Sequence, residues 1–325
     1  MNYRTLGKSG IKASEISLGC WAIGGPSWRN GEPVGWSGAD DAQSLAGLKK
    51  AFELGINHFD SADVYGDGHS EVLVGQFLKT VPRDKVVIAS KVGWFKGTAP
   101  HPFHPIHVRG QIAQSLANLG TDYIDIYYLH NAYFGDNDEY LAGAAEEVHR
   151  AKKDGKVRAV GQSAYDYGEF LRVCPVSRPD VIQLQYSALE PQYDEPGSDI
   201  FAWAEKQGIG MVLFGPLAQG LLLDKYDPDN PPKFGEGDIR ASNTGFTREE
   251  LLKLREKLKP VKARYGSSVP DLVKAALKYA LARSPLAVVI PGFKNPRQVE
   301  INASASDGHP FTKEDRDFIR KALRS

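Results

Sequence analysis

The sequence predicts an α/β fold, a (β/α)8 TIM barrel formed by a single domain that spans residues 1–325. Eight short strand-like segments alternate with helical patterns, which is typical of a parallel sheet whose strands are joined by helices. A chain of 325 residues fits eight such units in a closed barrel better than an open doubly wound sheet. No G-x-G-x-x-G motif follows the first strand, which argues against a Rossmann domain.

A hairpin is expected before the barrel. The segment YRTLGKSGIKASEISLG contains two short strand patterns around the turn sequence GKSG. It leads into the first barrel strand, which is predicted near Ile16–Gly19.

The other seven predicted barrel strands are short, rich in Val, Ile and Tyr, and apolar nearly throughout. This composition is expected when helices cover one face of a sheet and the barrel core covers the other. In chain order the segments read NHFD, KVVIAS, YIDIYYLH, VRAVGQS, VIQLQYS, IGMVLFG and LAVVIPG.

Amphipathic helical patterns lie between these strands. Three of them end at a glycine, the usual residue after a helix C-terminus, and Pro270–Asp271 is a favourable helix start. The glycines are Gly55, Gly120 and Gly155. The helical segments read DDAQSLAGLKKAFELG, SEVLVGQFLK, HVRGQIAQSLANLG, EYLAGAAEEVHRAKKDG, DIFAWAEKQG and PDLVKAALKYALAR.

One connection is much longer than the others. Residues 216–247, after the seventh strand, are rich in Pro, Gly and Asp, and an additional helical pattern follows at 248–266. A loop of this length in a compact domain is usually functional, and we expect it to cover a binding site.

Composition limits the classes of function. Forty Lys and Arg balance forty Asp and Glu, so no net charge favours nucleic acid or a membrane surface as a partner. The two cysteines form no disulfide framework and suit a reducing compartment. The start of the chain lacks the apolar core of a signal peptide, and no apolar run reaches membrane-spanning length. We therefore expect a cytoplasmic protein; the sequence does not predict its oligomeric state.

Polar side chains follow successive predicted strands. Because active sites of TIM barrels lie where the strands end, Asp60, Tyr65, Lys91 and His130 are expected to meet at one cavity. Taken singly, each has a simpler structural explanation, such as a solvated lysine or a hydrogen-bonded core histidine. Their occurrence at the ends of three consecutive strands favours a site.

Such a set suits proton transfer from a phenol. We expect the ammonium of Lys91 to lower the pKa of Tyr65, and Asp60 to keep Lys91 charged and oriented. His130 would orient a carbonyl oxygen or share the proton. Protonation of a carbonyl is useful only if a nucleophile attacks its carbon. No cysteine or metal cluster offers itself, and hydride from a nicotinamide cofactor fits.

These residues resemble the aldo-keto reductase superfamily over essentially the whole chain. FDSADVYG is similar to its Asp/Tyr segment, SKVG to its Lys segment and the LH at 129–130 to its His segment, and PLAQGLL and IPGFKNPRQVEIN add to the signature. The resemblance implies reversible, NADPH-dependent reduction of a small aldehyde or ketone, with Tyr65 as the acid. Asp60, Lys91 and His130 complete the catalytic tetrad. NADH is allowed but less expected than NADPH.

The resemblance also implies cofactor-binding positions. Trp21 and Asp60 border the nicotinamide ribose, Ser163 and Gln185 bind the carboxamide, and Phe214 lies against the nicotinamide ring. The remaining positions contact the pyrophosphate or the adenosine end, and Lys294 among them would meet the 2′-phosphate of NADPH. These positions are Gly215, Leu217, Gly220, Leu221, Lys225, Arg240, Gly292, Lys294, Gln298 and Asn302. Cys20, Ala164 and Ile301 depart from residues common in the family.

Several aromatic residues fall in loops on the side of the strand ends. They either pack the loops or line an apolar substrate pocket, and the sequence favours neither. The candidates for the pocket are Trp28, Trp94, Phe95 and Phe134. His101, His104 and His107 are spaced like metal ligands, but interleaved prolines prevent a regular helix, and no metal is expected.

Two other functions compete with reduction. Potassium-channel auxiliary subunits of this family bind NADPH with little turnover, but they tend to carry Asn where this chain has His130. A barrel enzyme that uses Lys91 to form a Schiff base is the other alternative, and borohydride trapping would detect it.

Overall fold

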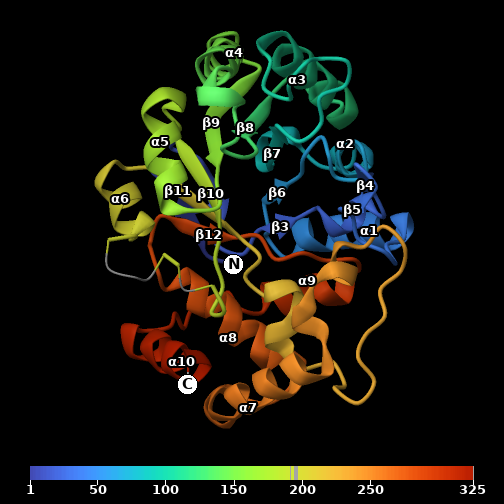
Figure 1. Ribbon diagram of the computed structural model, residues 1–325, viewed down its shortest axis with the longest axis vertical. Coiled ribbons are helices and arrows are strands. Elements are labelled where there is room, and N and C mark those ends of the chain that lie inside the picture. Colours follow the sequence, from blue (N-terminus) through green and yellow to red (C-terminus); the bar gives the residue numbers. More distant parts are fainter. Residues whose placement is uncertain (191, 194–196, 325) are drawn as a thin grey trace.

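The computed structural model describes residues 1–190, 192–193 and 197–324. Eight parallel strands form its central sheet, and helices surround the strands (Figure 1). The strands, in spatial order, are β3 (Leu18–Gly19), β6 (His58–Asp60), β7 (Val87–Val92), β8 (Ile124–Leu129), β9 (Val157–Ser163), β10 (Val181–Gln185), β11 (Gly210–Phe214) and β12 (Ala287–Val289).

The sheet closes on itself between its first and last strands. Parallel bridges join Ile16 to Val289 and Gly19 to Gly292, and the amide of Ser17 donates to the carbonyl of Val289 at 2.9 Å. Spatial order therefore follows chain order around a complete circle. The predicted (β/α)8 TIM barrel is confirmed.

The helices that connect the strands are α1 (Asp41–Glu53), α2 (His69–Leu78), α3 (Pro105–Leu119), α4 (Leu141–Lys153), α5 (Tyr167–Ser177), α6 (Ile200–Lys206) and α8 (Val269–Leu281). Helix α7 (Arg248–Tyr265) is the extra helix predicted before α8, and α9 (Pro296–Ala303) and α10 (Lys313–Arg324) follow β12. Capping supports these boundaries: Ser268 and Asp271 form a reciprocal capping box at the start of α8.

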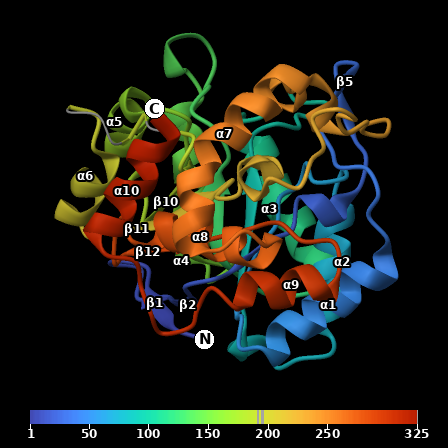
Figure 2. The same ribbon diagram turned by 90° about the horizontal axis from the view of Figure 1, so that it is seen from below.

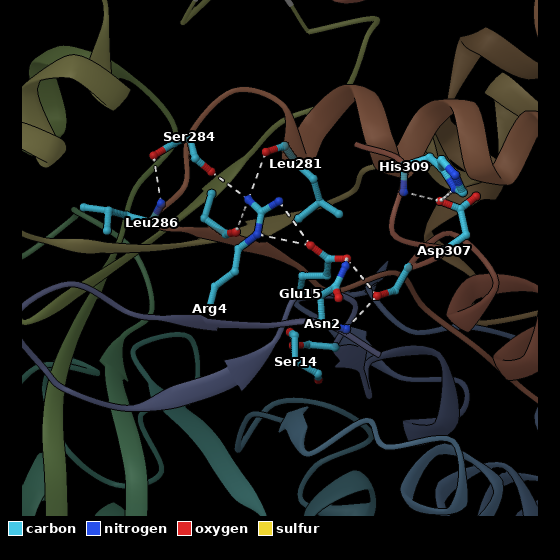
Figure 3. Close-up of polar contacts among 12 residues, drawn as sticks. Asn2, Arg4, Ser14, Glu15, Leu281, Ser284, Leu286, Asp307 and His309 are labelled. Atoms are coloured by element: carbon cyan, nitrogen blue, oxygen red, sulfur yellow. Dashed lines mark hydrogen bonds and ion pairs between the residues drawn. The ribbon is translucent and has the colours of Figure 1, made fainter. Parts of the chain in front are cut away.

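The N-terminal hairpin closes one end of the barrel. Strands β1 (Tyr3–Thr5) and β2 (Lys12–Ser14) pair antiparallel, as the sequence predicts. Arg4 donates to the carbonyls of Leu281, Ser284 and Ala287 at 2.8–3.1 Å and pairs with Glu15 (Figure 3). Figure 2 shows the hairpin beside the N-terminus, away from β5 (Glu32–Pro33) at the other end. A ligand must therefore enter from the end where the strands terminate.

Side chains two residues apart point into the barrel, because successive residues of a strand face opposite sides. An apolar layer that includes Val87, Ala89, Ile126, Tyr128 and Val212 fills the interior. Gly161 leaves the space that Tyr128 occupies: a Cβ there would lie 2.2 Å from the Tyr128 ring. The next inward positions along the strands are the predicted site residues.

Several elements were not expected from the sequence. Strands β4 (Trp28–Arg29) and β5 form a short antiparallel hairpin in a segment predicted as loop. Helix α5 was also missed, and it contains a proline, Pro175.

The long connection after β11 is docked against the loop that contains the β4–β5 hairpin. Asp238 accepts hydrogen bonds from the amide and hydroxyl of Ser37 at 2.8 Å and from Arg240 at 2.7 Å. Burial opposes ionisation of Asp238, but the bonds from Arg240 and Ser37 lower its pKa to about 2. The predicted loop therefore forms a fixed wall over the strand ends.

Candidate active site

A cavity of about 880 Å³ opens where the barrel strands end. Its wall includes the ends of β6, β8, β9, β10 and β11, the loop after β12, and parts of the long connection. Asp60, Tyr65 and His130 line it, and Lys91 lies directly behind them.

A chain of hydrogen bonds joins three residues of the predicted tetrad. Lys91 Nζ donates to Asp60 Oδ1 at 2.5 Å and to the carbonyl of Ser61 at 2.6 Å, and it lies 3.2 Å from the Tyr65 hydroxyl. The side chains of Asp60 and Lys91 are 1% and 0% exposed. The ammonium is therefore fixed against the phenol with no room to rotate away.

Gln183 also belongs to this arrangement, and the sequence reasoning missed it. Its Nε2 donates to Asp60 Oδ2 at 2.7 Å, so both carboxylate oxygens of Asp60 have a donor. Gln183 lies two residues before Gln185 on β10, so the alternation of that strand already pointed both side chains inward.

His130 lies edge-on to Tyr65, with ring centroids 5.8 Å apart. Burial, followed by the charges of Lys91 and Arg29, lowers its pKa well below 6.5, so the imidazole is neutral at neutral pH. Nδ1 is buried and has no hydrogen-bond partner among the described residues. Nε2 is therefore the nitrogen available to a ligand in the cavity.

The expected acidity of Tyr65 is wrong in direction. Burial and the nearby carboxylate of Asp60 raise its pKa well above 10. The ammonium of Lys91, although bonded to the phenol at 3.2 Å, does not offset these two effects. The phenol is therefore protonated and holds a proton that it can donate.

All of the predicted cofactor positions line the cavity. Ser163 ends β9 and Phe214 ends β11, the strands on either side of β10, and Trp21 stacks on Tyr65 at 5.9 Å. Gln185 donates to Glu190, a cavity residue that the sequence did not suggest. The remaining positions line the wall farther along: Gly215, Leu217, Gly220, Leu221, Lys225, Arg240, Gly292, Lys294, Gln298 and Asn302.

Three cations gather in this second part of the cavity. Burial, followed by the charge of Arg240, lowers the pKa values of Lys225 and Lys294. Arg240 stacks on Trp36 at 4.2 Å, and the Lys294 ammonium donates to the carbonyl of Ser37. Mutual repulsion among partly desolvated cations favours an anionic ligand. A cavity of about 880 Å³ whose wall carries both this cation cluster and the Tyr65 phenol fits a dinucleotide.

Three of the four expected pocket aromatics lie elsewhere among the described residues. Trp28 is 53% exposed and Phe95 is 49% exposed, and neither lines the cavity. Phe134 is fully buried because it stacks on Phe103 at 4.2 Å. Trp94 alone of the four faces the cavity.

Of the three departures from common family residues, only Ile301 lines the cavity. Cys20 is buried, and burial raises its pKa. Ala164 is fully buried in the apolar core.

Comparison with known proteins settles the family. The model of the aldo/keto reductase family matches residues 15–324. The chain belongs to this family. It is therefore an NAD(P)-dependent oxidoreductase that acts on carbonyl groups.

Relatives within the family support this assignment over the full length. The NADH-specific methylglyoxal reductase of Escherichia coli (strain K12) is 33% identical over 316 residues, 92% of each chain. The aldo-keto reductase AKR11C1 from Bacillus halodurans, in its holo form, has a TM-score of 0.77 and 29% identity over 99% of this chain and 96% of its own. The glycerol dehydrogenase AKR11B4 from Gluconobacter oxydans has a TM-score of 0.79 at 26% identity, covering 99% and 94%.

The described residues of this family member contain neither a membrane-spanning helix nor a cluster of metal ligands. None of its helices combines the length and apolar character that a membrane span requires. No group of three or more His, Cys, Asp or Glu side chains is placed to hold a metal ion.

Proposed function

We propose that this aldo-keto reductase reduces an aldehyde or ketone to the alcohol, with NADPH as the hydride donor and Tyr65 as the proton donor. The observation that carries the proposal is the buried chain from Asp60 through Lys91 to the Tyr65 hydroxyl at the cavity wall. A bound nicotinamide supplies hydride to the carbonyl carbon. Everything else that the reaction requires comes from side chains of this protein.

The protein moves one proton. The Tyr65 hydroxyl donates to the carbonyl oxygen as the C–O bond gains its electrons. Lys91 Nζ, 3.2 Å away, stabilises the phenolate that remains. Because Asp60 and Ser61 hold the ammonium, this stabilisation requires no rearrangement during the reaction.

Neutral His130 positions the carbonyl oxygen. A donor at Nε2 would share that oxygen with the Tyr65 hydroxyl and fix its direction. Phe214 offers a ring face to the nicotinamide, while Ser163 and Gln185 offer hydroxyl and amide groups to its carboxamide. A positioned general acid contributes roughly 10²–10⁴ in rate.

Preference for NADPH over NADH is part of the proposal. Lys294, Arg240 and Lys225 supply positive charge that suits the extra 2′-phosphate. NADH is the alternative, because the Escherichia coli relative is named as an NADH-specific reductase.

The test is a substrate panel with each reduced cofactor. Aldehydes, ketones and sugars are mixed with the protein and NADPH or NADH, and loss of nicotinamide absorbance is followed. The panel includes methylglyoxal and L-glyceraldehyde 3-phosphate, for which relatives are named. We expect turnover with at least one carbonyl class and a higher kcat/KM with NADPH. Tight NADPH binding without turnover of any compound would instead favour the regulatory-subunit alternative.

A further inference from the structure

The β4–β5 hairpin brings a cation to the cavity that the catalytic scheme does not use. Arg29 lines the cavity and is half-buried. Its guanidinium lies 4.2 Å over the Trp94 ring. Its side chain has no hydrogen-bond or ion-pair partner within the described residues. An arginine held on an aromatic face still presents its N–H edge to a ligand.

A series of ring contacts places Arg29 near the reacting end. Trp94 meets His130 edge-on with centroids 6.2 Å apart, and His130 meets Tyr65 in the same way. Burial lowers the pKa of His130, and the charges of Lys91 and then Arg29 lower it further. Burial raises the pKa of Tyr165, and the charge of Arg29 opposes that rise. In the cluster of Lys225, Arg240 and Lys294, by contrast, the charge of Arg240 lowers the pKa values of the two lysines, after the larger effect of burial. Arg29 is therefore a cation of the reacting end of the cavity, linked by ring contacts to His130 and Tyr65.

The charge of Arg29 is unmatched at this end of the cavity. Asp60 is already paired with Lys91. Glu190 also lines the cavity, but it accepts hydrogen bonds from Gln185 and Ser187 and forms no ion pair with Arg29. A charged group that is partly desolvated without a partner costs free energy unless a ligand supplies the counter-charge.

We propose that Arg29 binds an anionic group of the substrate, so that this enzyme prefers carbonyl compounds that carry a carboxylate or a phosphate. Tyr165, which lines the same cavity, can supply its hydroxyl as a second donor. This inference rests on the proposed carbonyl reduction and names its substrate class. A carboxylate or phosphate accepts two parallel bonds from a guanidinium, which also fixes its orientation.

The experiment compares two pairs of aldehydes, each with an anionic member and a neutral analogue. The first pair is 4-carboxybenzaldehyde and its neutral ester methyl 4-formylbenzoate. The second is glyceraldehyde 3-phosphate and glyceraldehyde. For each substrate, kcat/KM is measured for the wild type, Arg29→Met and Arg29→Lys. Taking the ratio of variant to wild type for each substrate cancels differences in intrinsic aldehyde reactivity.

We expect Arg29→Met to lower kcat/KM for the anionic member of at least one pair about 10- to 100-fold more than for its neutral member. The pair that responds identifies the anion as carboxylate or phosphate. Arg29→Lys should recover part of the loss in kcat/KM, because lysine keeps the positive charge but lacks the two parallel N–H donors of a guanidinium. The matched control is Lys49→Met on the outer face of α1, which removes one exposed charge and should not change either ratio.

Equal losses for charged and neutral members in both pairs would show that Arg29 only supports Trp94, and would overturn the inference while leaving carbonyl reduction intact. No change in either pair would overturn it as well. Failure of the wild type to reduce any of the four aldehydes would count against the proposed function itself, and the inference would fall with it.

Discussion

The buried Asp60–Lys91 pair invites a direct perturbation, the substitution Asp60→Asn. Asn keeps the shape of the side chain and removes its charge. In the native protein Asp60 accepts from Lys91 at 2.5 Å and from Gln183 at 2.7 Å, and both ion-pair side chains are almost completely buried. The variant leaves the ammonium of Lys91 in the same place without its counter-ion.

The cost follows from that burial. Removing one partner of a buried ion pair destabilises a protein by about 3–5 kcal/mol, because an uncompensated charge remains. Lys91 keeps its bonds to the Ser61 carbonyl and the Tyr65 oxygen, so we expect a value near 3 kcal/mol at pH 7.

The cost should also depend on pH. Without Asp60, the folded state disfavours the unpaired ammonium of Lys91. The variant is therefore most destabilised at neutral and lower pH, and the deficit shrinks in strongly alkaline solution, where the amine is neutral in the folded and the unfolded chain.

The assay is urea unfolding followed by tryptophan fluorescence at several pH values. The control is the double variant Asp60→Asn/Lys91→Met, in which no unpaired charge remains and which should be more stable than Asp60→Asn alone. A loss below ~1 kcal/mol at pH 7, with no dependence on pH, would refute the reasoning because it would mean that the pair is solvated.

Two other predictions use matched variants. Lys294→Met should weaken NADPH binding about 10- to 100-fold and NADH binding much less, because only NADPH has the 2′-phosphate. Binding is measured by titration with cofactor fluorescence. Equal weakening of both cofactors would show that Lys294 does not contact the 2′-phosphate. His58 is fully buried, and burial lowers its pKa to about 4, so its contribution to stability is complete above pH ~6.5 and is lost as pH falls toward 4. Between pH 7 and pH 5 the wild type should therefore lose about 2 kcal/mol more unfolding free energy than His58→Gln, and parallel losses in urea titrations would contradict this.

Much of the site could be predicted because strand periodicity determines it. Once Val87 and Ala89 face the barrel interior, Lys91 must follow them on the same side at the strand end. The same alternation places His130 after Tyr128. These positions depend only on local backbone geometry and on closure of the barrel.

The residues that were missed or misplaced depend on contacts that local patterns do not report. The two-residue strands β4 and β5 are too short to show periodicity, so Arg29 was not noticed. Phe134 was expected in the pocket, but its stacking on Phe103 is a tertiary contact. The raised pKa of Tyr65 depends on burial and on the Asp60–Lys91 pairing, which the sequence does not quantify.

The central claim is that Tyr65 gives its proton to the carbonyl oxygen. Tyr65→Phe removes only the hydroxyl, and it leaves the stacking partner of Trp21 in place. We expect NADPH to bind with nearly unchanged affinity, while the single-turnover rate of carbonyl reduction falls at least ~100-fold. Reduction at close to the wild-type rate in Tyr65→Phe, with the cofactor bound, would contradict the account.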